Sequence, residues 1–235
     1  MKTILITWNI AGLPYLINFS GTPVQKGEEI FSILNEYLKK PNVLVIVNLQ
    51  EMFDSGLILD MINLLKKNNY HYYYNPYKKN KYFGINSGLF TISNHPIKDS
   101  KFIKYKNGYG EDNFSNKGIT GCLINNIWVI NTHMQNGNVM IGNVNEGFKA
   151  HKKQIKELHN FLNNNNKYLC AGDFNIDLND LKNEIDIKNS WSPKIKTCIN
   201  GTPDYIISNF EIKSPNLTTK NFEKLSDHRM VIFEF

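Results

Sequence analysis

The chain has 235 residues, of which 41% are hydrophobic and 20% charged, and its 27 basic residues outnumber the 21 acidic ones to give a formal net charge of +6. This composition excludes a disulfide-stapled mini-protein and a wholly disordered chain, and it is typical of one domain with a sizeable core. The positive charge favours anionic partners such as nucleic acid, phosphorylated metabolites or lipid headgroups, without choosing among them. No apolar run is long enough for a transmembrane segment, and polar residues interrupt the N-terminal stretch where a signal peptide would stay apolar. We therefore expect a soluble, intracellular protein of the cytoplasm.

The N-terminal part of the chain predicts a layered α/β arrangement. Residues 2–9 have strand composition, residues 27–40 place apolar side chains on one helical stripe, and residues 42–50 form a second apolar strand. A strand, a helix and a strand with a short return set the two strands side by side, and their continuous apolar runs indicate burial on both faces. Residues 54–67 then repeat the helical pattern.

The rest of the chain is mostly predicted strand. Short apolar segments at residues 101–105, 117–124 and 126–133, separated by turns rich in Asn and Gly, are typical of an antiparallel sheet. A further helix is expected over roughly residues 148–162. Strand composition also occurs at residues 70–74, 87–93, 167–175, 204–208 and 229–235. No internal repeat or linker is evident, so we expect a single domain over residues 1–235.

Polar side chains recur where the predicted strands stop. The set comprises Asn9, Gln50, Glu51, His133, Asp173 and Asn175, together with Asp204 and the run Ser226-Asp227-His228. In layered α/β folds ligands gather beyond strand ends, because side chains there escape the core while the scaffold fixes them. Carboxylate and amide oxygens without clustered cysteines favour Mg²⁺, or Mn²⁺, over structural zinc, and Glu51 is the first choice of ligand.

The identity of the general base is open between two residues. His228, next to Asp227 and with Asp204 to orient it, would hold its imidazole in one tautomer for proton transfer or for contact with a phosphoryl oxygen. Asp173 would instead orient the attacking water. Periodicity does not decide between them.

Seven motifs in a fixed order resemble those of the endonuclease/exonuclease/phosphatase superfamily, which includes DNase-like nucleases, inositol phosphatases and neutral sphingomyelinases. They are TWNIAGLP, LQEMFD, SGLFTISNHP, INTHMQNG, AGDFNID, PDYIIS and LSDHRMV, and they cover nearly the whole chain. The resemblance implies a four-layer α/β/β/α sandwich of the DNase I-like type, with two packed mixed sheets flanked by helices. It also implies Mg²⁺-dependent hydrolysis of a phosphoester by an in-line water.

The resemblance also implies roles for the residues of these motifs. Asn9 and Glu51 match the metal-binding pair of the family, and His133 matches the histidine that stabilises the phosphoryl oxygens. Asp173 matches the water-orienting aspartate, and Asn175 the asparagine that contacts phosphate or metal.

The last two motifs supply an aspartate and a histidine that pair with each other. Asp204 matches the aspartate that pairs with the histidine of the SDH motif. His228 matches that histidine, the family's usual candidate for general base or phosphate activator, and Asp227 is assigned as a further metal ligand.

Within the superfamily, the motif combination is most similar to neutral sphingomyelinase-like phosphodiesterases. Lys117-Gly118 and the run from Thr132 to Gln135 fit their pattern, and Lys117 is a further candidate for substrate binding. The chain departs from the family where Gly201-Thr202-Pro203 stands in place of an arginine-containing segment. The stretch between the GDFN and PDY motifs is also short.

Two other functions stay open. A nuclease or DNA-end-processing phosphodiesterase is favoured by the basic balance and by aromatic residues interleaved with Lys78, Lys79 and Lys81, which suit base stacking or a headgroup layer. A non-catalytic binding module with the same fold is the third reading. We expect a monomer whose substrate is a phosphoester, either a lipid headgroup or nucleic acid.

Overall fold

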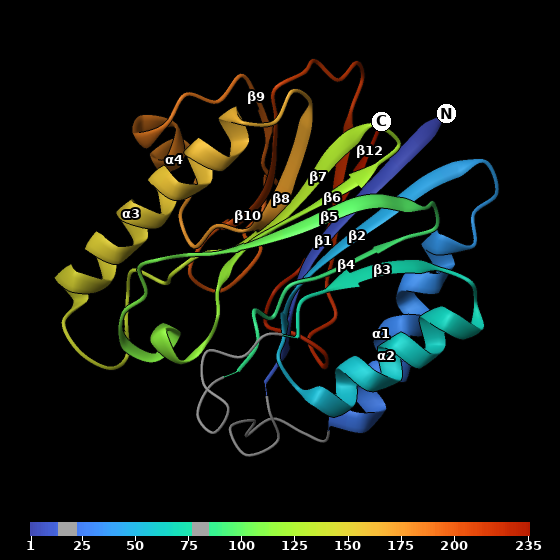
Figure 1. The fold of residues 1–235 in the computed structure, drawn as a ribbon, viewed down its shortest axis with the longest axis horizontal. Coiled ribbons are helices and arrows are strands. Elements are labelled where there is room, and N and C mark those ends of the chain that lie inside the picture. The colour runs from blue at the N-terminus through green and yellow to red at the C-terminus, as the bar shows by residue number, and fades with distance from the viewer. Residues whose placement is uncertain (14–22, 77–84) are drawn as a thin grey trace.

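The computed structural model describes residues 1–13, 23–76 and 85–235, which form two packed sheets with helices on their outer faces (Figure 1). The first sheet has the strand order β11-β12-β1-β2-β4-β3. Its strands are β1 (Lys2–Gly12), β2 (Val43–Met52), β3 (His71–Tyr74), β4 (Phe90–Ser93), β11 (Asn216–Lys220) and β12 (Met230–Glu234).

The second sheet has the order β5-β6-β7-β8-β10-β9. Its strands are β5 (Ile97–Lys104), β6 (Gly118–Ile124), β7 (Ile127–His133), β8 (Tyr168–Asp173), β9 (Asn189–Trp191) and β10 (Asp204–Ser208). The helices are α1 (Pro23–Leu38), α2 (Ser55–Lys67), α3 (Val144–Asn163) and α4 (Leu178–Glu184), with the short 3₁₀ helix η1 (Gly110–Phe114).

Each sheet has one parallel strand pair at its centre, joined by a helical crossover. In the first sheet β1 and β2 are parallel, with α1 between them in sequence, and Asn9 lies opposite Gln50. In the second sheet β7 and β8 are parallel, with α3 between them, and His133 lies opposite Asp173. Parallel strands end at the same edge of their sheet, so each crossover unit brings two polar side chains to that edge.

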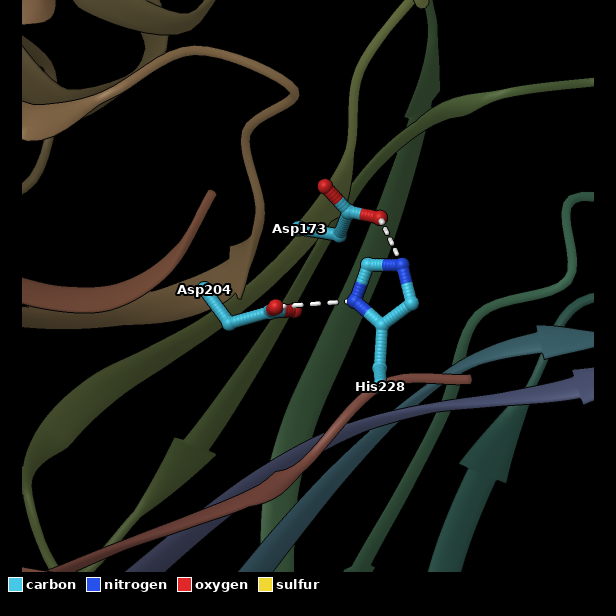
Figure 2. Close-up of side chains that lie close together, drawn as sticks. All are labelled: Asp173, Asp204 and His228. Atoms are coloured by element: carbon cyan, nitrogen blue, oxygen red, sulfur yellow. Dashed lines mark hydrogen bonds and ion pairs between the residues drawn. The ribbon is translucent and has the colours of Figure 1, made fainter. Parts of the chain in front are cut away.

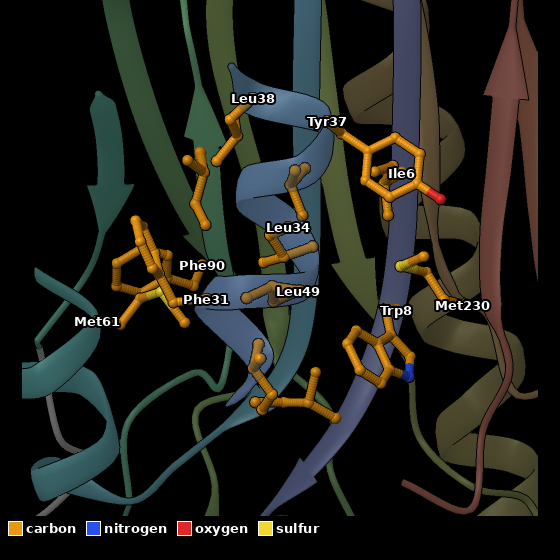
Figure 3. Close-up of a cluster of buried hydrophobic side chains, with 14 of the residues drawn as sticks. Ile6, Trp8, Phe31, Leu34, Tyr37, Leu38, Leu49, Met61, Phe90 and Met230 are labelled. Atoms are coloured by element: carbon orange, nitrogen blue, oxygen red, sulfur yellow. The ribbon is translucent and has the colours of Figure 1, made fainter. Parts of the chain in front are cut away.

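Apolar side chains form three clusters, one for each interface between layers. Ile6 and Leu34 belong to the cluster between the first sheet and α1 and α2 (Figure 3). Leu5 and Val129 belong to the cluster between the two sheets. Phe161 belongs to the cluster between the second sheet and α3 and α4. Successive residues of β1 thus point to opposite faces, as the pleat requires, and the predicted four-layer α/β/β/α sandwich is confirmed.

Buried amides join the two sheets across their shared core. Asn48 of β2 donates to the carbonyls of Ile130 and Ala171 in the second sheet, at 3.0 and 3.2 Å. In the opposite direction, Asn131 of β7 donates to the carbonyl of Leu49 at 3.0 Å. Since buried polar groups need partners, these bonds fix how one sheet lies on the other. Neither asparagine was predicted to have this role.

The structure differs from the predicted elements mainly in short segments. The elements not predicted are α4, β9, β11 and η1. The strand β11 shows why, because Leu217 is its one large apolar residue and its side chains alternate only between exposed and half-buried. The helix α3 also begins four residues before the expected Phe148, where the Asn143 side chain accepts from the Asn145 amide at 2.9 Å and caps it. None of the described helices combines the length and hydrophobicity that spanning a bilayer requires.

Candidate active site

Four strand ends bring four polar side chains together at one edge of the sandwich. The Asn9 side-chain amide donates to Glu51 Oε1 and to Asp173 Oδ2, each at 3.0 Å. His133 Nε2 lies 3.8 Å from Glu51 Oε1 and 3.7 Å from Asp173 Oδ2. Asn9 and Glu51 come from the first sheet and His133 and Asp173 from the second, so the cluster joins both sheets.

Asn9 is oriented by the backbone that follows it. Its Oδ1 accepts a hydrogen bond from the amide of Ala11 at 3.1 Å, which turns the Nδ2 toward the two carboxylates. In this arrangement Asn9 holds Glu51 and Asp173 in place as a donor. Its assignment as a metal ligand stays a prediction.

The backbone at this edge adopts conformations that cost energy. Ala11, Glu51 and Asn175 have φ angles of 46°, 58° and 51°, in the left-handed region that favours glycine. The pairing of β1 with β2 also shifts register between Asn9 and Gly12. Such irregularities redirect side chains near sites, and here they surround the residues that the motifs single out.

A second group, formed by His228 and Asp204, adjoins the first at Asp173 (Figure 2). His228 Nδ1 donates to Asp204 Oδ2 at 2.8 Å, and its Nε2 lies 3.9 Å from Asp173 Oδ2. Asp204 begins β10 and lies opposite Asp173 in the sheet register. The three side chains therefore form a row with the imidazole between two carboxylates.

The main chain of His228 is held on both sides. The Ser226 hydroxyl accepts from the His228 amide at 2.9 Å and donates to the Asn9 carbonyl at 2.6 Å. The indole nitrogen of Trp8 donates to the His228 carbonyl at 3.1 Å. The imidazole is therefore fixed to the end of β1 through two residues of the core.

The two histidines of the site differ in charge at neutral pH. Burial opposes the charge on His228, but the carboxylate of Asp204 with its hydrogen bond, and that of Asp173, raise its pKa to about 11. Burial, assisted by the positive charge of Lys117, lowers the pKa of His133 to about 3. The site thus pairs a cationic imidazole with a neutral one.

The two central carboxyl groups also differ. Burial raises the pKa of Glu51. Burial acts on Asp173 in the same sense, but the two histidines and the hydrogen bond from Asn9 outweigh it and lower the pKa of that carboxyl. Asp173 is therefore ionised at neutral pH, while the surroundings of Glu51 disfavour its charged form.

Asn175 and Lys117 meet at the carbonyl oxygen of Met134, one residue beyond β7. Asn175 Nδ2 donates to it at 2.9 Å and Lys117 Nζ at 3.1 Å. Lys117 is buried and also forms an ion pair with Asp112 of η1, at 2.7 Å. Its ammonium group supports the loop that positions Asn175, and its predicted contact with substrate stays a prediction.

One assigned residue is exposed, unlike the side chains of the cluster. Asp227 is exposed and lines a surface depression of about 300 Å³ with residues that include Lys196 and Arg229. It was assigned as a metal ligand beside Glu51, a role that stays a prediction. The predicted stacking lysines Lys78, Lys79 and Lys81 lie outside the described residues.

Two residues near the site were missed in the sequence. Lys26 of α1 donates to the Ala11 carbonyl at 3.0 Å, and its charge interacts with Glu51 and Asp227. His151 of α3 has its Nε2 2.9 Å from the carbonyl of Phe174, between Asp173 and Asn175. Both lie on helices between the motifs, where neither motif nor periodicity marks them.

The oxygen donors of this edge fit a hard divalent cation. Asp173, Asp204 and His228 have ligand atoms within 4.8 Å of one another, but the Nδ1 of His228 is committed to Asp204 and the ring is charged. Glu51 is better suited, because burial raises its pKa and no lysine or arginine forms an ion pair with it among the described residues. A cation between Glu51 and Asp173 would supply the missing positive charge, and carboxylate oxygens suit Mg²⁺.

A known protein is similar to this chain in sequence. Sphingomyelinase C of Bacillus cereus is 30% identical over 127 residues, which are 50% of this chain and 37% of that protein. The chain therefore matches well under two thirds of the length of this relative.

Solved structures match over nearly the whole chain. Sphingomyelinase C from Streptomyces griseocarneus has a TM-score of 0.78 at 16% identity, covering 100% of this chain and 99% of that one. A variant of beta toxin from Staphylococcus aureus, solved with bound magnesium ions, has a TM-score of 0.74 at 19% identity, covering 98% of both chains. These likenesses show the DNase I-like fold. The sequence model of the Endonuclease/Exonuclease/phosphatase family matches residues 6–228, and the chain therefore belongs to that family.

Proposed function

We propose that this protein is a Mg²⁺-dependent phosphodiesterase that releases phosphocholine from sphingomyelin. The observation that carries the chemistry is the convergence of Asn9, Glu51, His133, Asp173 and the Asp204–His228 pair at one edge of the two sheets. The choice of substrate is supported by the match to Sphingomyelinase C. The choice of metal is supported by the structural match to beta toxin with bound magnesium ions.

The proposed reaction is attack of a water oxygen on phosphorus, in line with the bond to the ceramide oxygen. The new P–O bond forms as the bond to ceramide breaks, one water proton passes to the carboxylate of Asp173, and the ceramide oxygen takes up a proton. Mg²⁺ held by Glu51 would neutralise charge on the phosphoryl oxygens. Asp173, ionised and fixed by Asn9, orients the water.

The two histidines act on the other oxygens in this proposal. His228 is cationic and held by Asp204, so its Nε2 proton is available to a phosphoryl oxygen or to the leaving oxygen. Neutral His133 and the Asn175 amide stabilise the remaining charge. Removal of one such group lowers the rate by about 10²- to 10³-fold, the scale of a single oxyanion donor.

The test is release of phosphocholine from sphingomyelin in mixed micelles with Mg²⁺. We expect release by the unmodified protein, a loss of about 10²- to 10³-fold for His228→Ala, and a comparable loss for Glu51→Gln. The matched control is His71→Ala, because His71 is exposed on the edge strand β3. A folded protein that releases no phosphocholine contradicts the proposal. Cleavage of nucleic acid by the same preparation would then favour the nuclease alternative.

A further inference from the structure

A loop beside the candidate active site exposes large apolar side chains. Met140 is 86% exposed and Ile141 62%, and the first turns of α3 add Val144 at 43% and Phe148 at 44%. We name these four residues the α3 tip. Val144 and Phe148 are four residues apart on a helix and therefore lie on the same face.

The α3 tip is fixed to the body of the protein. The two carboxylate oxygens of Glu111 in η1 accept hydrogen bonds from its backbone amides, from Met140 at 2.9 Å and from Ile141 at 3.1 Å. The Tyr109 hydroxyl accepts from the Asn143 amide at 3.1 Å. These hydrogen bonds hold the loop so that its apolar side chains point into solvent. Because exposed apolar surface is unfavourable in water, such a fixed projection indicates a binding partner.

A second exposed apolar pair lies in the turn before β10. Ile195 is 50% exposed and Ile199 84%, and we name them the β10 turn. Lys194 and Lys196 flank Ile195 and are also exposed. Backbone bonds between Cys198 and Gly201 close the turn.

The chain segments that carry the α3 tip and the β10 turn both adjoin the candidate active site. In the second sheet β7 and β10 lie on either side of β8, which ends at Asp173. The chain leaves β7 toward the α3 tip directly after His133, opposite Asp173, and it enters β10 from the turn at Asp204, also opposite Asp173. Both therefore leave the sheet at the edge that holds the candidate active site, an arrangement that can be followed in Figure 1.

The neighbourhood of the β10 turn adds charge. Ile199 and Lys196 line the depression next to His228, where Arg229 and Lys196 face the acidic residues Glu223 and Asp227. The surplus of positive charge comes from Lys194, which is exposed and flanks Ile195. Basic side chains beside apolar ones match the phosphate groups that lie above the acyl chains of a bilayer.

We propose that the α3 tip and the β10 turn are two insertion points that seat this edge on the surface of a choline-lipid bilayer. The inference rests on the proposed function for the identity of the lipid. Two separate apolar projections on segments that leave the sheet at the edge of the hydrolytic site need a partner that is wide, apolar beneath a phosphate layer, and able to present a phosphodiester at that edge. A lipid surface meets all three conditions.

The test is flotation with vesicles of sphingomyelin and phosphatidylcholine in EDTA, so that no lipid is hydrolysed. The variants are Met140→Ser with Ile141→Ser, and Ile195→Ser with Ile199→Ser. Each pair should lower the vesicle partition coefficient by at least about tenfold, because several buried methylene groups are lost. The matched control is Leu59→Ser on α2, a 58% exposed leucine outside both projections, and it should bind like the unmodified protein.

A second measurement separates docking from chemistry. Hydrolysis of the soluble diester bis(4-nitrophenyl) phosphate with Mg²⁺ should be the same in both double variants as in the unmodified protein. Their circular dichroism spectra and melting temperatures should also match those of the unmodified protein, which shows that they fold whether or not any substrate is hydrolysed. Lost vesicle binding in both variants supports docking, even if no substrate is hydrolysed and the proposed function fails. Unmodified protein that does not float, or double variants that float as well as the control, overturns docking whatever the hydrolysis assays show.

Discussion

His228 and Asp204 form a hydrogen bond between the two sheets. His228 lies just before β12 of the first sheet, Asp204 begins β10 of the second, and the imidazole Nδ1 donates to the carboxylate at 2.8 Å. Both residues are buried. Loss of one partner from a buried pair leaves the other uncompensated, which makes this bond important for stability as well as for the proposed chemistry.

Asp204→Asn should lower the free energy of unfolding by about 3 kcal/mol at pH 6. The pKa of His228 is raised to about 11 from an ordinary value of 6.5, so its stabilisation is fully present below pH 6.5 and is lost as the pH rises through about 11. The difference between the two proteins should therefore narrow from pH 7 to pH 11. Urea unfolding at a series of pH values, in EDTA, measures it. A difference that stays constant over that range would refute the charged pair.

Glu51→Gln should separate stability from Mg²⁺ binding. Burial raises the pKa of Glu51, so the amide removes an unfavourable charge, and the metal-free variant should melt at the same temperature as the unmodified protein or higher. The unmodified protein should gain about 2.7 kcal/mol at a Mg²⁺ concentration one hundred times the dissociation constant, and the variant should gain far less. Calorimetric melting with and without Mg²⁺ gives both values. An unchanged Mg²⁺ effect in the variant would exclude Glu51 as a ligand.

Asn9→Ala should weaken metal activation without unfolding the protein. The side chain holds Glu51 and Asp173 at 3.0 Å each, and loss of such an orienting group lowers metal affinity by about 10- to 100-fold. The Mg²⁺ concentration for half-maximal activity should rise by that factor. Asn160→Ala, at an exposed position of α3, is the control and should leave it unchanged. Equal activation curves for the two variants would show that the bridge has no role in metal binding.

Lys117→Met should destabilise the protein by about 3 kcal/mol, because it leaves the half-buried carboxylate of Asp112 without its ion-pair partner. The double variant Lys117→Met with Asp112→Asn should recover much of this loss, since no unpaired charge then remains. Urea unfolding of the single and double variants measures the coupling. Additive losses would mean that the ion pair contributes little.

The strongest periodic patterns predicted most of the fold. Secondary structure was clear for α1 and α2, which have apolar stripes, and for β1 and β2, which have long apolar runs. These four elements supply many buried side chains to one core cluster, so their sequence patterns are strong. By contrast β11 lies at a sheet edge and buries little, and β9 has only three residues. Such strands form because a neighbouring strand offers hydrogen bonds, which no local pattern records.

The candidate site could be predicted as a set of residues but not as a geometry. Motifs identified Glu51, His133 and Asp173, and the parallel pairs explain why they meet. Nothing in the sequence shows that Asn9 turns its amide nitrogen toward both carboxylates, which depends on the left-handed turn at Ala11. Nor does the SDH motif show that Asp227 lies at the exposed rim while its neighbour His228 is buried.

The cross-sheet bonds of Asn48 and Asn131 have a consequence for how the protein loses activity. The first sheet supplies Asn9 and Glu51, and the second supplies His133 and Asp173, so neither half holds a complete set of donors. A slide of one sheet over the other by a single residue, about 3.3 Å, would misplace the donors while each sheet kept its own ladder and its own helices. The proposed activity therefore depends on the alignment of the two sheets. It should disappear on heating before the circular dichroism of the strands changes.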